Sequence, residues 1–234
     1  MLEDQYGNTL STSSNAARDG YVAAVDAVLS AAQDPAVGLQ ASLNADPNFA
    51  LAHTAMARHL MLLGDIKNAR QSITQAQELA KNLTPREQQH IEIFELLLTG
   101  RSKEALTLTR KHIQEYPRDA FALAPSTSVF GLIGFGGNIG REDEQVELLE
   151  PLRDAYGDDW WFQTVYAFAL IETGQWQQGR DLAQQALEVR PRSAHTAHIY
   201  AHALYEGGED QALVNYLEDW LPEYPESLLL SCHI

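Results

Sequence analysis

The chain of 234 residues carries 32 acidic and 16 basic side chains, which gives a formal net charge of −16. The charge is uneven, because residues 142–234 hold 18 acidic and 4 basic side chains, a net charge of −14. Nucleic acids and anionic lipid surfaces attract lysine and arginine, so neither is expected as a partner. With 45% hydrophobic residues, the chain has enough apolar side chains to fold around a sizeable core.

Targeting signals and disulfides are not expected either. The first six residues lack the basic segment and apolar run of a secretory signal. No stretch approaches the roughly 20 apolar residues of a membrane span. Cys232 is the single cysteine, so the chain cannot form an internal disulfide. We therefore expect a cytoplasmic protein.

The first predicted helix runs from about Asn15 to Ala32, and the preceding Ser11 and Thr12 are candidates for its N-cap. After this helix, glycines that favour turns recur at intervals of 36, 37, 37 and 33 residues. These glycines are Gly64, Gly100, Gly137, Gly174 and Gly207.

Each glycine is predicted to join two antiparallel helices. Residues 50–63 have a helical pattern that ends at Gly64, and Ala69, Ile73 and Ala76 follow with the spacing of the buried stripe of a second helix. The copy around Gly174 is the clearest, and Pro191 closes it because proline cannot continue a helix.

These patterns predict an all-α fold, a right-handed superhelical array of antiparallel helix pairs, because each pair has an apolar face that only a stacked neighbour can bury. One domain is expected over residues 1–234. Its predicted helical pairs are residues 10–45, 46–82, 84–118, 119–156, 158–192 and 193–225.

A cluster of glycines between residues 131 and 140 invites comparison with a phosphate-binding loop. Lysine followed by serine or threonine does not come after it, Ile139 stands where the dinucleotide fingerprint needs glycine, and no strand pattern precedes it. We interpret the cluster as a turn between helices, with residues 141–153 as an acidic second helix. No cofactor and no metal ion are predicted.

Several stretches resemble the tetratricopeptide repeat protein 38 family. They include Leu-Ser-Thr-Ser-Ser-Asn-Ala-Ala near the N-terminus and Leu-Thr-Pro-Arg-Glu-Gln-Gln-His in the middle of the chain. In full they are Leu10–Ala17, Asp46–Phe49 with His53, Leu83–His90, Tyr116–Asp119, Ala167–Thr173 and Ala197–His202. The resemblance implies a helical repeat fold and no established reaction.

The last residues, Ser231 to Ile234, resemble the start of the family's Cys-His-x-x-Trp-His motif. The resemblance therefore implies that the chain corresponds to the N-terminal half of a family member. An uncapped last helical pair would then expose an apolar face, and a homodimer through that face is one expected assembly.

Five residues are candidates for a ligand-binding site in the family-like stretches. His198 and His202 are four residues apart on one helix face, so their imidazoles can share a ligand or a metal ion. His53 and His90 lie in the first helices of their pairs. Glu87 beside His90, or Glu172 beside the turn at Gly174, can supply a carboxylate.

A packing role for these residues stays open as well. Histidines in first helices also pack between repeats, and no His-Glu-x-x-His metalloprotease motif is present. Thr84, Pro85 and Glu87 have the spacing of an N-cap, a first-turn proline and a capping box. Cys232 and His233 are adjacent, so as helical neighbours they would point in different directions.

Two functions follow as hypotheses. The first is a binding module whose concave face holds a protein, peptide or small ligand, and the acidic second half with its tryptophans and tyrosines favours a basic or amphipathic partner. The alternative is an enzyme of unknown reaction with a histidine-lined pocket.

Overall fold

The computed structural model describes residues 2–226, 228, 230 and 231. The chain divides into two compact units, which are considered separately: unit 1 is Met1–Asp26 with Pro35–Pro125, and unit 2 is Ala27–Asp34 with Ser126–Ile234. Apart from a hairpin of β1 (Leu2–Glu3) and β2 (Thr9–Leu10), the regular structure in the described residues is helical. The all-α prediction is therefore confirmed.

Helix α1 (Asn15–Ser30) begins in unit 1 and ends in unit 2. Its N-cap is Ser14, whose hydroxyl accepts a hydrogen bond from the backbone N–H of Ala17 at 3.2 Å, so the prediction of Ser11 or Thr12 as the cap was wrong. Thr12 instead donates its hydroxyl to Asp46, at 2.6 Å. Thr12 therefore does not cap α1, because its hydroxyl bonds to a residue from another part of the chain.

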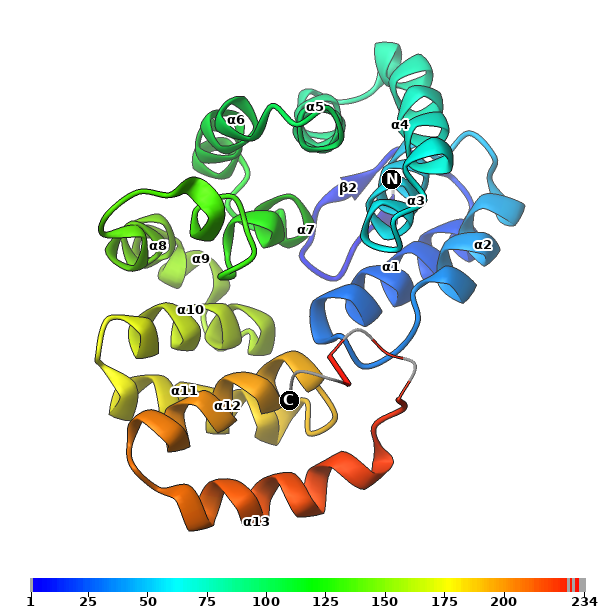
Figure 1. Ribbon diagram of the computed structural model, residues 1–234. Helices are drawn as coiled ribbons and strands as arrows, with labels where there is room; N and C mark the ends of the chain where they lie inside the picture. Colours follow the sequence, from blue (N-terminus) through cyan, green and yellow to red (C-terminus); the bar gives the residue numbers. More distant parts are fainter. Residues whose placement is uncertain (1, 227, 229, 232–234) are drawn as a thin grey trace. The chain divides into compact units, whose positions relative to one another are not determined.

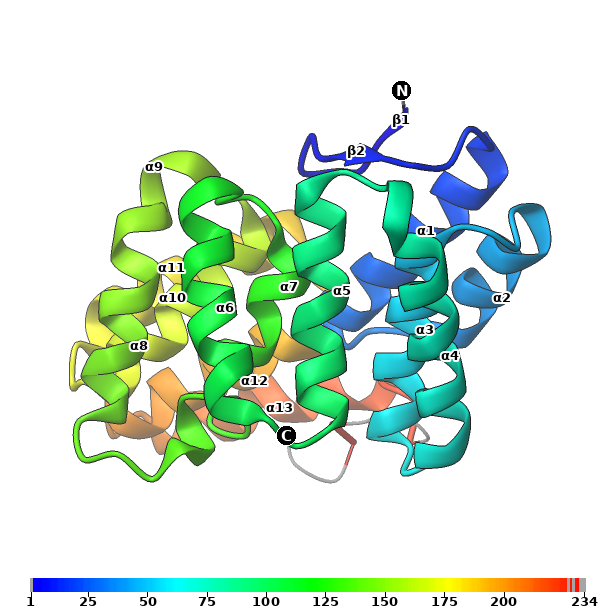
Figure 2. The same ribbon diagram turned by 90° about the horizontal axis from the view of Figure 1, so that it is seen from above.

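The helices of unit 1 form neighbouring pairs, with α3 against α4 and α5 against α6, and Figure 2 shows these four side by side. Their bounds are α2 (Ala36–Ala45), α3 (Ala50–Leu62), α4 (Ile66–Leu79), α5 (Pro85–Leu98), α6 (Ser102–Glu115) and α7 (Ala120–Leu123), with 3-10 segments η1 (Ala80–Asn82) and η2 (Ala124–Ser126). Helix α4 buries Ala69, Ile73 and Ala76, as its sequence predicted.

The helices of unit 2 are packed in sequence order, α10 on α11, α11 on α12 and α12 on α13 (Figure 1). Their bounds are α8 (Arg141–Leu149), α9 (Arg153–Tyr156), α10 (Trp160–Glu172), α11 (Trp176–Val189), α12 (Ala194–Glu206) and α13 (Asp210–Trp220), with 3-10 segments η3 (Gly134–Gly136), η4 (Glu150–Leu152) and η5 (Leu221–Glu223). Phe168, Ile171, Ala183 and Ile199 belong to the core between them.

The turns explain the recurring glycines. Gly64, Gly100, Gly137 and Gly174 have φ between 70° and 82°, a left-handed conformation that glycine adopts without strain. At the fifth position the left-handed residue is Gly208, with φ of 68°, so the assignment of that turn to Gly207 was wrong. A Cβ on Gly207 would lie 2.9 Å from the Trp176 ring, so close packing accounts for that glycine.

The region from residue 119 to 156 departs most from a helix pair. Helix α7 has four residues and passes into η2 at Pro125, which lacks the N–H that an α-helix needs. The predicted second helix over 141–153 ends at Leu149, because Pro151 interrupts it and the chain continues as η4 and α9.

Among the described residues, no helix has the length and apolar character needed to cross a lipid bilayer.

Candidate functional site

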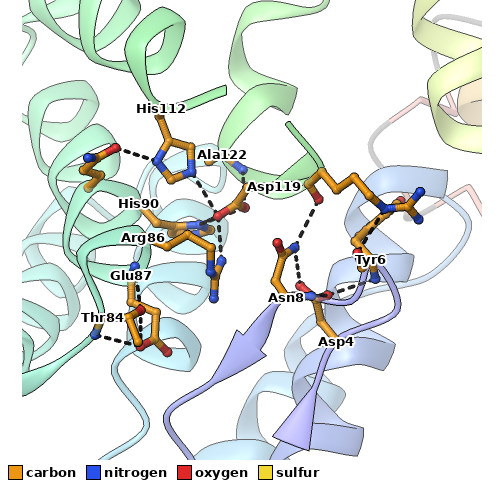
Figure 3. Close-up of polar contacts among 12 residues, drawn as sticks. Asp4, Tyr6, Asn8, Thr84, Arg86, Glu87, His90, His112, Asp119 and Ala122 are labelled. Carbon is orange, nitrogen blue, oxygen red and sulfur yellow. Dashed lines mark hydrogen bonds and ion pairs between the residues drawn. The ribbon is translucent and has the colours of Figure 1, made fainter. Parts of the chain in front are cut away.

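Asp119 is the centre of a buried polar network in unit 1 (Figure 3). It precedes α7, and its carboxylate accepts a hydrogen bond from the backbone N–H of Ala122, so the side chain caps that helix. Arg86 Nη1 lies 2.6 Å from Asp119 Oδ2. His90 Nδ1 and His112 Nε2 approach the same oxygen at 3.0 and 3.1 Å. A single carboxylate thus joins α5, α6 and α7.

The network keeps Asp119 ionised. Burial by itself would raise the pKa of this carboxyl, but His90, His112 and Arg86 together hold the pKa well below its usual value. Burial also acts against the charge of Arg86, yet Asp119 keeps the pKa of the guanidinium above its usual value. Each buried charge is therefore stabilised by its partners, as buried ion pairs require.

The same residues hold the N-terminal hairpin segment. Arg86 Nη2 donates to the carbonyl of Thr9 at 2.9 Å, and Glu87 Oε1 accepts from the backbone N–H of Ser11 at 2.9 Å. Arg118 Nε donates to the carbonyl of Tyr6 at 3.0 Å. Three of the stretches that resemble the tetratricopeptide repeat protein 38 family therefore meet here, and their charged side chains make internal contacts.

Glu87 has the capping role that its spacing predicted. Thr84 Oγ1 accepts from the Glu87 backbone N–H at 3.3 Å, and the Glu87 carboxylate accepts from the Thr84 backbone N–H at 3.4 Å. Both halves of the capping box at the start of α5 are present, with Pro85 in the first turn. The capping prediction is confirmed.

The three candidate ligand residues of unit 1 have different hydrogen-bond partners. Glu87 and His90 are fully buried, bonded to the N-terminal segment and to Asp119 respectively. His53 Nε2 lies 2.8 Å from the carbonyl of Pro47. A ligand-binding role for these residues stays a prediction.

His198 and His202 meet on α12 in unit 2, as their spacing predicted. Their Nε2 atoms are 3.0 Å apart and the rings are nearly perpendicular, at 81°. One imidazole donates the shared proton and the other accepts it. The Phe168 ring from α10 is nearly perpendicular to the His202 ring, with ring centroids 6.4 Å apart. Within the described residues, no three metal-binding side chains are grouped to hold an ion.

Two carboxylates of unit 2 lie near enough to Glu172 for their charges to act on it. Glu172 and Glu206 end α10 and α12, and Glu142 lies in the first turn of α8. Burial and the charges of Glu142 and Glu206 raise the pKa of Glu172, with Arg141 acting in the opposite direction. A small cleft beside them is lined by Val129, Gly134, Arg141, Glu142, Gln145, Phe168 and Glu172. We call Glu142, Glu172 and Glu206 the Glu172 surface.

Sequence reasoning did not select Asp119, His112 or Glu206 as site residues. Asp119 had a local signal, because an aspartate after Tyr116-Pro117 and before an apolar run is typical of a helix N-cap. Its ion pair with Arg86 had none, since the two residues are far apart in the sequence. Cys232 and His233 lie outside the described residues.

Compared with models of protein families, the chain matches none. The similarity to the tetratricopeptide repeat protein 38 family accordingly stays a prediction.

Proposed function

We propose that the chain is a helical-repeat binding module, a superhelical member of the tetratricopeptide repeat protein 38 family, and that unit 2 binds a basic or amphipathic segment of a partner protein. The packed helix pairs and the glycine turns support the repeat architecture. The Glu172 surface supplies the binding chemistry.

The observation that carries this proposal is the unfavourable position of Glu172 in the free protein. Its carboxylate ends α10, where the helix dipole is negative, and the charges of Glu142 and Glu206 act on it. Partial burial raises the pKa of Glu172 most, and the negative charges of Glu142 and Glu206 raise it further. A bound ammonium or guanidinium group would offset these negative charges.

The cleft holds only about 10 Å³, so the side chain of a lysine or arginine would lie across its mouth and not inside it. The partly buried Val129 offers apolar surface for an aliphatic stem, and Glu172 and Glu142 line the same cleft. Long basic side chains bind in this way, with the methylene groups on apolar surface and the charged end beside a carboxylate.

Unit 2 has few cations of its own to neutralise these carboxylates. Its arginines form ion pairs with nearby acids, such as Arg141 with Glu142 at 2.7 Å and Arg153 with Glu150 at 3.0 Å, so Glu172 and Glu206 hold the uncompensated charge of the Glu172 surface. The remaining negative charge would steer a basic partner toward the surface, and the association rate would fall as salt rises.

The test is the affinity for an amphipathic peptide of alternating lysine and leucine, measured by fluorescence anisotropy at low and high salt. Replacing Glu142, Glu172 and Glu206 by glutamine is expected to weaken binding roughly 10-fold or more, at about 0.5–1 kcal/mol for each surface charge. The control removes the same charge elsewhere in unit 2, from the exposed Glu188, Glu218 and Asp219. Equal affinities of the two triple variants would reject the Glu172 surface as the binding site.

A second candidate is an enzyme of unknown reaction that uses His198 and His202. The 3.0 Å approach of their Nε2 atoms favours it, because two such nitrogens form a proton donor and acceptor pair or two ligands of one ion. Calorimetric titration of chelator-treated protein with Zn²⁺ tests the metal form. Binding that is lost in the His198→Ala/His202→Ala double variant and kept in His59→Ala would support it, and absence of stoichiometric binding would remove it.

A further inference from the structure

Arg58 is a half-buried cation without an anionic partner. It lies on α3 in unit 1, and its guanidinium carbon stands 4.8 Å from the centre of the Phe121 ring. The Nη1 atom is buried and has no hydrogen-bond acceptor. In the part of the chain that the structure describes, no carboxylate lies within ion-pairing distance of this side chain.

Other shielded arginines of the protein are satisfied. Arg86 has the Asp119 carboxylate and the Thr9 carbonyl, and Arg118 has the Tyr6 carbonyl. Arg192 donates to the Trp220 carbonyl while it lies over the Trp220 ring. Arg118 and Arg192 each lie over an aromatic ring and also donate a hydrogen bond. Arg58 lies over the Phe121 ring, but its Nη1 atom has no acceptor.

The missing acceptor has an energetic consequence. Burial lowers the pKa of Arg58 to about 10, and no charged group among the described residues offsets this effect. The guanidinium still carries its full charge at neutral pH. A desolvated charge without a counter-charge destabilises the folded state. An anion bound beside Arg58 would neutralise this charge, and the attraction between the two charges would stabilise the complex.

The surroundings of Arg58 indicate which anion. The Phe121 ring stacks on His90 at 5.8 Å and contacts Phe94 at 5.2 Å, so the side chain rests on an aromatic cluster. Asp119 below this cluster is fully engaged by Arg86, His90 and His112. One positive charge is therefore unbalanced, and a single negative charge is enough to balance it.

We propose that Arg58 binds the carboxylate of a ligand whose body is apolar. The N–H groups of a guanidinium point outward in its own plane, where a planar carboxylate accepts two of them. A phosphate dianion would bring an excess negative charge into a half-buried place. This proposal concerns unit 1 and is independent of the Glu172 surface of unit 2.

The experiment measures the affinity and the melting temperature of the full chain with 3-phenylpropionate as the probe. Acetate tests the need for the apolar body, 3-phenylpropanol tests the need for the charge, and inorganic phosphate tests the alternative anion. The variants are Arg58→Met, which keeps apolar contact with Phe121, and Arg58→Lys, which keeps the charge without the planar fork. Arg70→Met, on the exposed surface of α4, is the matched control.

The expected result is that 3-phenylpropionate raises the melting temperature of the wild type and of Arg70→Met. Arg58→Met should bind it roughly 10-fold to 100-fold more weakly, since a charged hydrogen-bond donor is lost. Arg58→Lys should fall between them. Without ligand, Arg58→Met should unfold at the same or a higher temperature than the wild type, because the uncompensated charge is gone.

Three outcomes would overturn the proposal. Equal binding by wild type and Arg58→Met would place the carboxylate elsewhere. Stabilisation by phosphate and not by 3-phenylpropionate would show that the site binds phosphate and not a carboxylate. An Arg58→Met variant that is folded by circular dichroism, is less stable than wild type and loses no carboxylate binding would show that Arg58 only stacks on Phe121. Because the Glu142, Glu172 and Glu206 variant should keep 3-phenylpropionate binding, failure here is distinguishable from failure of peptide binding.

Discussion

The guanidinium of Arg86 lies 2.6 Å from the carboxylate of Asp119, and both side chains are almost completely removed from solvent, at 7% and 3% exposure. This ion pair connects α5 to the start of α7. Through the carbonyl of Thr9, Arg86 also holds the N-terminal hairpin. Arg86 and Asp119 thus fasten three segments of the chain to one another.

Replacing Asp119 by asparagine should destabilise the protein by about 3–5 kcal/mol, because Arg86 would keep its charge in a buried place without a partner. The matched control is Asp65→Asn, since Asp65 caps α4 through Asn68 in the same way but is not buried. Asparagine caps helices as well as aspartate does, so the control should change little. Denaturant unfolding measures both, and similar losses in the two variants would contradict a role for the buried charge.

The contribution of Asp119 should depend on pH. Its pKa in the folded protein lies well below the usual value, and in the unfolded chain it is about 3.9. The stabilisation is therefore complete above the unfolded pKa and is lost as the pH falls from there through the folded pKa. The readout is the free energy of unfolding of the wild type minus that of Asp119→Asn. This difference should shrink below about pH 4, and a constant difference would show that the carboxylate is not stabilised by its partners.

The contact between His198 and His202 should appear as a coupling energy. Each alanine substitution changes helix propensity too, and a double-mutant cycle removes that effect. We expect a coupling of about 0.5–1.5 kcal/mol for a half-buried hydrogen bond. Gln211 and Asn215 on α13 form an exposed pair at the same spacing and should give about 0.2–0.5 kcal/mol. A histidine coupling no larger than this control would mean that the two imidazoles act separately.

Two glycines of η3 provide a test of the glycine-rich turn. A Cβ on Gly134 would lie 1.9 Å from the carbonyl oxygen of Val129, whereas a Cβ on Gly136 would meet only the Asn138 side chain at 3.7 Å. Gly134→Ala should therefore cost about 1–3 kcal/mol or more. Gly136→Ala should stay within about 0.5 kcal/mol of the wild type. Thermal and denaturant unfolding measure both, and equal stability of the two variants would contradict the tight turn.

Local features of the fold could be predicted well from the sequence. Each of these features involves residues a few positions apart. They are the capping box of Thr84 and Glu87, the buried stripe of α4, the left-handed glycines at 64, 100, 137 and 174, and the contact between His198 and His202. Backbone geometry alone fixes such relations. The turn at Gly207 was misplaced by one residue because the ring of Trp176 fills the space beside that glycine.

The amino-acid sequence by itself determined the helical pairs and the strongly negative charge of the later part of the chain, since periodicity, capping and charge are properties of neighbouring residues. Only the tertiary structure decided that Arg86, His90 and His112 surround Asp119, that Thr9 and Ser11 dock on α5, and that Arg58 reaches Phe121 with no acceptor. These contacts join residues that are far apart in the sequence, and their interaction energies depend on how far each side chain is removed from solvent. Which charges are compensated and which one is left for a ligand is therefore a property of the packed helices.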